Sequence, residues 1–170
     1  FKSCGWRVVG HGAPIRVRRD STWNVPEPEM TLVINAEREI VGYCVGNDVS
    51  SRSIEGENPL YLPQAKIFNG CCALGPGIGL MDSDALADLP IHLRILRQGS
   101  PAFDGDTRTS KISRALSSLV DYLFMETAFP PGVFLMTGTG IVPPESFSLS
   151  PGDTVRITIG ELTLENAVGV

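Results

Sequence analysis

The chain has 170 residues, with 14 basic and 19 acidic side chains and a formal net charge of −5 at pH 7. This length can bury one hydrophobic core and predicts a single domain, whereas the acidic balance argues against nucleic acid as a partner. No apolar run is long enough to cross a bilayer and no signal-peptide pattern is visible, so we expect a cytoplasmic protein without a membrane partner.

Short strands and turns are predicted along the first half of the chain. Residues 1–25 are rich in Gly, Pro and Arg and are expected to be irregular. The apolar run 30–35, the polar turn 37–39 and the apolar run 40–45 together predict a β-hairpin. Residues 50–66 are polar and contain two X-Pro breakers, so they are predicted to form turns.

Further strands are predicted in the second half. The alternating run 91–96 predicts a strand, and residues 99–105 are expected to form the turn after it. Residues 133–136 predict another short strand. The runs 154–159 and 161–166 predict a final hairpin.

One helix is predicted, over residues 112–126. Its apolar residues recur at helical spacing and form one stripe. The stripe consists of Ile112, Leu116, Leu119, Val120, Leu123 and Phe124. Thr109 or Ser110 is expected to cap the N-terminus of this helix. Several short strands around one main helix indicate an α+β fold that is mostly β.

Three carboxylates lie next to predicted strands. Glu27 and Glu29 are two residues apart in an extended, proline-flanked segment, so their side chains share a face and repel unless a cation lies between them. Asp48 follows an apolar strand, where a carboxylate needs a partner or a metal. Exposed loop glutamates and a turn aspartate are the alternative. Oxygen-only ligands predict a hard divalent cation, Mg²⁺ first, with Mn²⁺ or Ca²⁺ also compatible.

Two further segments could act on a ligand. Lys66 lies between Ala65 and an apolar pair, and a partly buried lysine can pair with an anion or act as an acid or base at lowered pKa. The alternative is a lysine whose stem packs while its amine stays in water. Residues 137–140, Thr-Gly-Thr-Gly, could bind a carboxylate through amides and hydroxyls, or could be a plain turn.

Taken together, these motifs resemble the fumarylacetoacetate hydrolase family. They occur in the family's order over about residues 8 to 166. The matching motifs are Glu-x-Glu at 27–29, Asn-Asp-Val-Ser-x-Arg at 47–52, Pro-Gln-x-Lys at 63–66, Leu-Gly-Pro at 74–76 and Thr-Gly-Thr-Gly at 137–140.

One branch of the family is more similar than the others. The segments 18–29 and 51–66 resemble the 2-keto-3-deoxy-D-arabinonate and -xylonate dehydratases. Glu29 and Asp48 are also only nineteen residues apart (48 − 29), and the hydrolase branches usually carry a longer insert there.

The resemblance implies a fold and a set of roles. The expected fold is the family's mixed β-roll with one main helix, with residues 1–170 as a catalytic domain that lacks the N-terminal segment of longer members. It also implies a homodimer that acts on a small-molecule 2-keto acid. The implied roles are Mg²⁺ binding by Glu27, Glu29 and Asp48, acid–base catalysis by Lys66 with a pKa tuned toward neutrality, and binding of the substrate carboxylate by Thr139 and Thr137.

The activity implied by the resemblance is dehydration of a 2-keto-3-deoxy pentonate through a metal-stabilised enolate, giving 2-oxoglutarate semialdehyde. Glu57 and Asn58 are predicted to contact the C4–C5 end of this substrate, with ordinary loop solvation as the alternative. Two other activities stay open: hydrolytic C–C cleavage of an acylpyruvate or fumarylacetoacetate-type diketo acid, and metal binding without catalysis. Because the first residue is Phe1 rather than Met, we expect the sequence to be part of a longer product.

Overall fold

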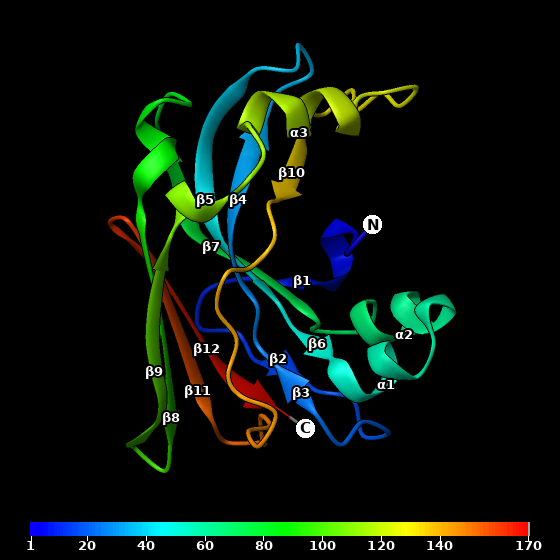
Figure 1. The fold of residues 1–170 in the computed structure, drawn as a ribbon, viewed down its shortest axis with the longest axis vertical. Coiled ribbons are helices and arrows are strands. Elements are labelled where there is room, and N and C mark those ends of the chain that lie inside the picture. Colours follow the sequence, from blue (N-terminus) through cyan, green and yellow to red (C-terminus); the bar gives the residue numbers. More distant parts are fainter. Residues whose placement is uncertain (170) are drawn as a thin grey trace.

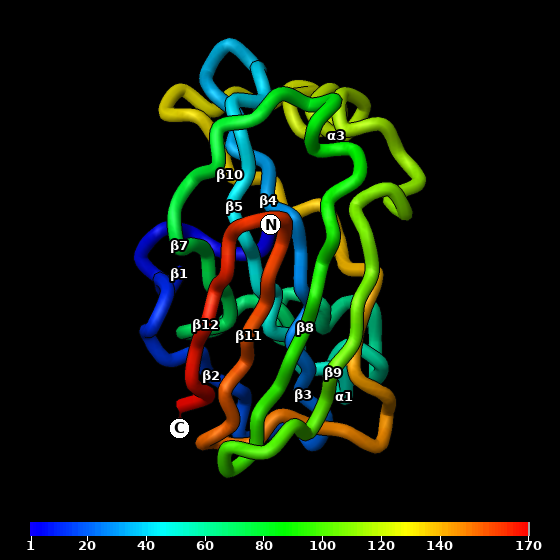
Figure 2. The backbone as a smooth tube through the Cα atoms, turned by 90° about the vertical axis from the view of Figure 1, so that its left-hand side faces the viewer, coloured from blue at the N-terminus to red at the C-terminus, as the bar shows by residue number. Residues whose placement is uncertain are grey.

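Two packed β-sheets form the body of the molecule (Figure 1). The computed structural model describes residues 1–169. In sheet order, the first sheet contains β1 (Val8–Val9), β7 (Cys72–Leu80), β5 (Ile40–Asp48), β4 (Pro28–Ile34) and β10 (Val133–Met136). The second contains β2 (Ile15–Arg16), β12 (Leu162–Gly169), β11 (Thr154–Ile159), β8 (Pro90–Arg97) and β9 (Ser100–Arg108). Figure 2 faces the second sheet, with the first behind it.

Short helices and one small strand pair complete the fold. Strands β3 (Asn24–Val25) and β6 (Ser50–Ser51) pair separately from the two sheets. The α-helices are α1 (Arg52–Glu57), α2 (Leu62–Lys66) and α3 (Leu116–Leu123). The 3₁₀ turns are η1 (Gly5–Arg7), η2 (Pro59–Tyr61), η3 (Ala85–Asp88) and η4 (Thr109–Lys111). Among residues 1–169, no helix is long and apolar enough to cross a membrane.

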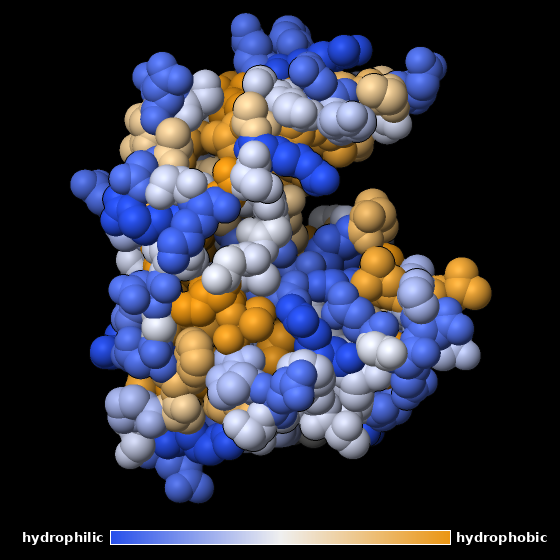
Figure 3. All heavy atoms as spheres, viewed as in Figure 1, coloured by the Kyte–Doolittle hydropathy of each residue, from blue (hydrophilic) through white to orange (hydrophobic). Residues whose placement is uncertain are grey.

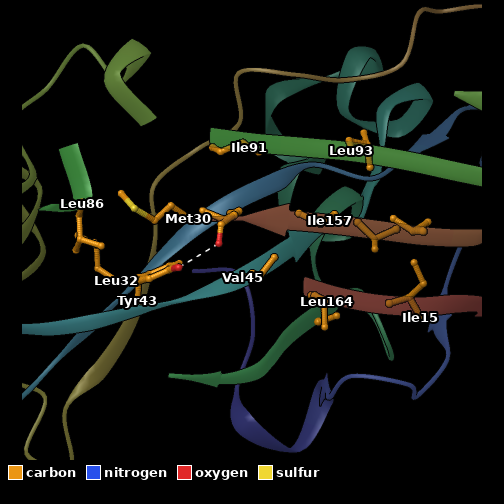
Figure 4. Close-up of a cluster of buried hydrophobic side chains, with 14 of the residues drawn as sticks. Ile15, Met30, Leu32, Tyr43, Val45, Leu86, Ile91, Leu93, Ile157 and Leu164 are labelled. Atoms are coloured by element: carbon orange, nitrogen blue, oxygen red, sulfur yellow. Dashed lines mark hydrogen bonds between the residues drawn. The ribbon is translucent and has the colours of Figure 1, made fainter. Parts of the chain in front are cut away.

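The hydrophobic core lies between the two sheets (Figure 4). Strand β8 alternates buried and partly exposed residues, so its apolar side chains share the inner face. Strands β4 and β5 are buried over most of their length, which places the polar residues on them in a low-dielectric environment. The Tyr43 hydroxyl on β5 donates to the carbonyl oxygen of Ile159 on β11 at 3.0 Å and joins the sheets.

Strands β7 and β9 are not predicted from the sequence, for different reasons. Strand β7 contains three glycines and a proline, which weaken its strand pattern, and β5 closely approaches it at one of them: a Cβ on Gly79 would lie 2.8 Å from Tyr43 Cε1. Strand β9 is an edge strand with mostly exposed side chains, so it lacks a strong apolar pattern. The predicted turn over 99–105 is therefore wrong beyond its start. The actual turn is Gln98-Gly99, where both residues have positive φ.

The helical predictions also need correction. Helix α3 covers only Leu116–Leu123 and not the predicted 112–126. Thr109 and Ser110 do not cap it, because they belong to the separate 3₁₀ turn η4. The Thr109 hydroxyl instead donates to the carbonyl oxygen of Leu86. Within 50–66, the X-Pro pairs start helical turns at η2 and α2, since proline fits the first positions of a helix.

The predicted fold class is confirmed: the fold is mostly β with few helices. The sheets are mixed, because β1 pairs with β7 and β2 with β12 in parallel, whereas the remaining pairs are antiparallel.

Candidate metal centre

The β4–β5 hairpin brings three carboxylates together. Glu29 faces Gly46 across the hairpin, so Asp48 at the end of β5 reaches Glu27 just before β4. The Asp48 N–H donates to the carbonyl oxygen of Glu27 at 3.0 Å, and the Glu27 N–H donates to Asn47 Oδ1 at 3.2 Å. Glu27, Glu29 and Asp48 each present one carboxylate oxygen, and these oxygens lie within 4.8 Å of one another.

Spacing and burial of this cluster fit a small dication. Glu27, Glu29 and Asp48 are 5%, 4% and 9% exposed. Around an octahedral Mg²⁺, oxygens on opposite sides lie about 4.2 Å apart and neighbouring ones about 3 Å apart. The three oxygens lie within 4.8 Å of one another, so the side chains would move closer together on binding Mg²⁺. The structure brings the three residues together, and their ligand role stays a prediction.

Three side-chain cations surround the carboxylates. Lys66 Nζ donates to Glu27 Oε2 at 2.5 Å and to Asp48 Oδ2 at 3.2 Å. Arg52 Nη2 lies 2.6 Å from Glu27 Oε1, and Lys2 Nζ lies 2.5 Å from Asp48 Oδ1. The positive charge that the carboxylate repulsion requires is thus supplied in part by the chain itself.

Glu29 lacks such a partner. Within residues 1–169 no basic side chain forms an ion pair with it, and Oε2 accepts only the Gly138 N–H, at 2.6 Å. Burial raises the pKa of Glu29 to about 7, and the nearby Asp48 and Glu27 carboxylates add to the rise. Glu29 is therefore the point at which an added cation would be most strongly attracted.

Metal affinity should depend on pH because of Glu29. A proton on this carboxyl must leave before a cation binds, so in chelator-treated protein the affinity for Mg²⁺ should fall about tenfold per pH unit below about pH 7 and level off above it. Calorimetric titration in buffers with different protonation enthalpies would measure the released proton. The exposed-site variant Glu37→Gln should give the wild-type profile, and a flat profile through this range would contradict the prediction.

Lys66 is held as an ammonium group at this centre. Its Nζ also donates to Ser50 Oγ at 2.6 Å. Burial lowers the pKa of Lys66, but the Asp48 and Glu27 carboxylates raise it by more, and the net pKa is raised. The expectation of a pKa tuned toward neutrality is wrong for this state, because both carboxylates stabilise the charged amine.

The Thr-Gly-Thr-Gly segment contacts the centre through its backbone. The Thr137 hydroxyl donates to the carbonyl oxygen of Met30 at 2.7 Å, and the Thr139 hydroxyl donates to that of Ile141 at 3.0 Å. Both hydroxyl protons are thus already used within the chain. Backbone N–H groups, such as the one Gly138 points at Glu29, are the better-placed donors for an anion.

Helix α1 presents a different glutamate from the predicted one. Glu57 is exposed, and Asn58 accepts the Leu60 N–H at 2.9 Å. Neither contacts the carboxylate cluster within the described residues, so their substrate role remains a prediction. Glu55 lies one helical turn after Arg52, 3.8 Å from its Nε, and Glu55 Oε2 is buried without a hydrogen-bond partner.

The N-terminal residues and the loop after β10 both contact the carboxylates. Figure 3, in the same view as Figure 1, shows the surface indented between the N-terminal residues and the α3–β10 region. The loop after β10 also lines a cavity of about 230 Å³ through Thr137, Gly138, Thr139 and Gly140.

A two-sheet β-roll with a buried acidic cluster beside a lysine defines a known class of protein. Residues 5–169 match the family described as fumarylacetoacetate (FAA) hydrolase, C-terminal, and the chain belongs to this family.

The chain is also similar to named members. It is 44% identical over 165 residues to 2-dehydro-3-deoxy-D-arabinonate dehydratase of Saccharolobus solfataricus, covering 95% of this chain and 55% of that protein. It is 47% identical over 170 residues to a probable 2-keto-3-deoxyxylonate dehydratase of Haloferax volcanii, covering 99% and 58%. A solved 2-keto-3-deoxy-D-arabinonate dehydratase complexed with magnesium and 2,5-dioxopentanoate superposes with a TM-score of 0.91 at 44% identity, covering 96% of this chain and 59% of that one. The chain thus spans a little more than half the length of these relatives.

Proposed function

We propose that this chain is the catalytic domain of a Mg²⁺-dependent dehydratase that converts a 2-keto-3-deoxy pentonate to 2-oxoglutarate semialdehyde. The convergence of Glu27, Glu29, Asp48 and Lys66 carries the proposal. Dehydratases with 44% and 47% identity support it, as does the relative solved with magnesium and 2,5-dioxopentanoate, another name for the same semialdehyde.

Different residues would bind the metal and transfer protons. Glu27, Glu29 and Asp48 would hold Mg²⁺, which when bound supplies Lewis-acid stabilisation of negative charge on a 2-keto acid. The Lys66 ammonium holds a proton that can pass to the C4 hydroxyl as it leaves as water. Glu55, whose charge also raises the pKa of Lys66, is a carboxylate that can accept the proton lost from C3. The resulting C3=C4 alkene keeps the C5 hydroxyl. Loss of a proton from C5 and return of a proton to C3 give an enol, and transfer of the enol proton to C4 gives the aldehyde of 2-oxoglutarate semialdehyde.

A substrate comparison tests the proposal. The chain with Mg²⁺ is incubated with 2-keto-3-deoxy-D-arabinonate, with the xylonate isomer and with an acylpyruvate, and the products are identified by mass spectrometry. Formation of 2-oxoglutarate semialdehyde is expected. Cleavage of the acylpyruvate alone would favour the C–C hydrolase that the family description suggests. Mg²⁺ binding without consumption of any substrate would favour a non-catalytic metal-binding fragment.

Two glutamates on α1 provide a matched test of the site. Glu55→Gln should lower turnover by about a hundredfold, because it removes the proposed proton acceptor, which lies 3.8 Å from Arg52 and whose charge raises the pKa of Lys66. Glu57→Gln, on the exposed side of the same helix, should keep wild-type kcat and raise KM, because Glu57 is predicted to contact the C4–C5 end of the substrate and not to move a proton. Measurements of kcat and KM at saturating Mg²⁺ would check both. Equal kcat for the two variants would remove Glu55 from the mechanism, and an unchanged KM for Glu57→Gln would contradict its predicted contact with the substrate.

Three broader expectations belong to the same proposal. We infer that residues 1–170 act as one catalytic domain, that the protein is a homodimer, and that it works in the cytoplasm. The match of the family over residues 5–169 supports the first. The metabolic relatives support the third. The mass of the protein in solution, by light scattering, tests the second.

A further inference from the structure

Lys2 makes two hydrogen bonds and one ion pair at the edge of the metal centre. Its Nζ donates to the carbonyl oxygen of Lys66 at 2.6 Å and to that of Val49 at 3.0 Å, and it lies 2.5 Å from Asp48 Oδ1. An ammonium group has donors and no acceptor, so each of these oxygens is a favourable partner. The Lys2 side chain is only 12% exposed, so these contacts lie largely out of solvent.

These partners belong to the two segments on which the proposed chemistry depends. Asp48 and Val49 end β5 and lead away from it, whereas Lys66 ends α2. Lys2 comes from a third segment, before β1, and bonds to both. The Phe68 ring, 5.8 Å from the Lys2 ammonium, packs beside it from the residues that follow α2. Lys2 thus fixes the end of α2 against the end of β5.

The bonds of Lys2 differ in kind from those of Lys66. Lys66 Nζ contacts the side-chain oxygens of Glu27, Asp48 and Ser50, and the first two are the oxygens that a metal would attract. Two of the three Lys2 partners are main-chain carbonyl oxygens, which stay available when a cation binds. The Lys2 contacts can therefore persist while those of Lys66 change.

We propose that Lys2 is a positioning residue that sets the place of Lys66 relative to Asp48. The effect on turnover rests on the proposed dehydratase function, whereas the effect on Lys66 itself does not. Because Lys2 is a cation beside a candidate ligand, removing it takes away no attraction for Mg²⁺. Loss of Lys2 should therefore lower turnover without weakening Mg²⁺ binding.

The test compares Lys2→Met, which keeps the apolar stem, with Lys2→Arg, which keeps the charge and the donors. Arg19→Met removes an exposed basic side chain as the control. Each full chain is measured for kcat and KM with 2-keto-3-deoxy-D-arabinonate, for the Kd of Mg²⁺, and for the rate of acetylation of Lys66 by peptide mass spectrometry. Lys2→Met should lower kcat about 10- to 100-fold. Its KM should stay near wild type, its Mg²⁺ Kd should stay the same or fall because a competing cation is lost, and Lys66 should be acetylated several times faster.

The remaining outcomes decide the proposal. Lys2→Arg should lie between wild type and Lys2→Met in kcat and in Lys66 acetylation, and Arg19→Met should match wild type. A wild-type kcat for Lys2→Met, or a loss of kcat matched by an equal loss of Mg²⁺ affinity, would overturn the proposal. If Lys2→Met does not fold, wild-type kcat and acetylation in Lys2→Arg would overturn it. If the wild type does not turn over this substrate, the dehydratase proposal fails, and Lys66 acetylation alone decides the role of Lys2.

Discussion

Replacing Glu29 with glutamine should weaken Mg²⁺ binding by at least about a hundredfold and reduce turnover to background. Loss of a group that hydrogen-bonds to a metal ligand commonly reduces metal affinity 10- to 100-fold. Loss of the ligand itself should reduce the affinity at least as much. Glu29 is the carboxylate of the cluster that lacks a side-chain cation, so its negative charge is the one most available to a metal. Calorimetry with Mg²⁺ and a dehydration assay would measure both effects.

The same variant should stabilise the metal-free protein. Burial raises the pKa of Glu29 from 4.5 to about 7, so its contribution to stability is present below about pH 4.5 and is lost as the pH rises through 7. Glutamine removes this titration, and at about pH 8 the free energy of unfolding should rise by about 3 kcal/mol. Denaturant unfolding with a chelator would measure it. Glu37→Gln, an exposed substitution, should change neither property. A destabilised Glu29→Gln with intact Mg²⁺ binding would show that the carboxylate is structural.

The sequence predicts the acidic cluster because its parts depend on local structure. Glu27 and Glu29 share a face in any extended segment, and a hairpin with a short turn must bring Asp48 back beside them. The positions of the basic side chains around the cluster could not be predicted in the same way. Lys2 reaches Asp48 across 46 positions (48 − 2) through the folded sheet, and no spacing rule connects them. Arg52 and Glu55 could be found only by assigning α1, whose helical spacing of three places both on one face.

Errors in the predicted strands also arise from the tertiary fold, which the local sequence does not show. Glycine in β7 resembles a loop signal, yet at Gly79 a side chain would contact Tyr43 of the neighbouring strand β5. Polar residues in β9 read as a turn because an edge strand has little apolar surface to bury. Strands β8 and β11 are predicted correctly, because their apolar residues alternate along the sequence and the same residues are buried in the core.

Charge balance explains how the centre can exist before a metal binds. Lys2, Lys66 and Arg52 together match the charge of Glu27, Glu29 and Asp48, but none of them contacts Glu29. A dication bound between the carboxylates would give the group a surplus of positive charge, so one of these contacts should weaken. Lys66 is the best candidate, because its amine bonds to oxygens of both Glu27 and Asp48.

Lys66→Met should therefore bind Mg²⁺ more tightly than the wild type and yet turn over at least about a hundredfold more slowly. Removing the ammonium removes a cation that competes for the oxygens of Glu27 and Asp48, which should lower the Kd of Mg²⁺. It also removes the proton donor, and acid–base groups contribute about 10²- to 10⁴-fold to rate. Calorimetry and single-turnover kinetics on one preparation would measure both, with the exposed-site variant Arg19→Met as the control. Retention of wild-type turnover would exclude Lys66 as the acid. Weaker Mg²⁺ binding would mean that Lys66 holds the carboxylates in place for the metal rather than competing with it.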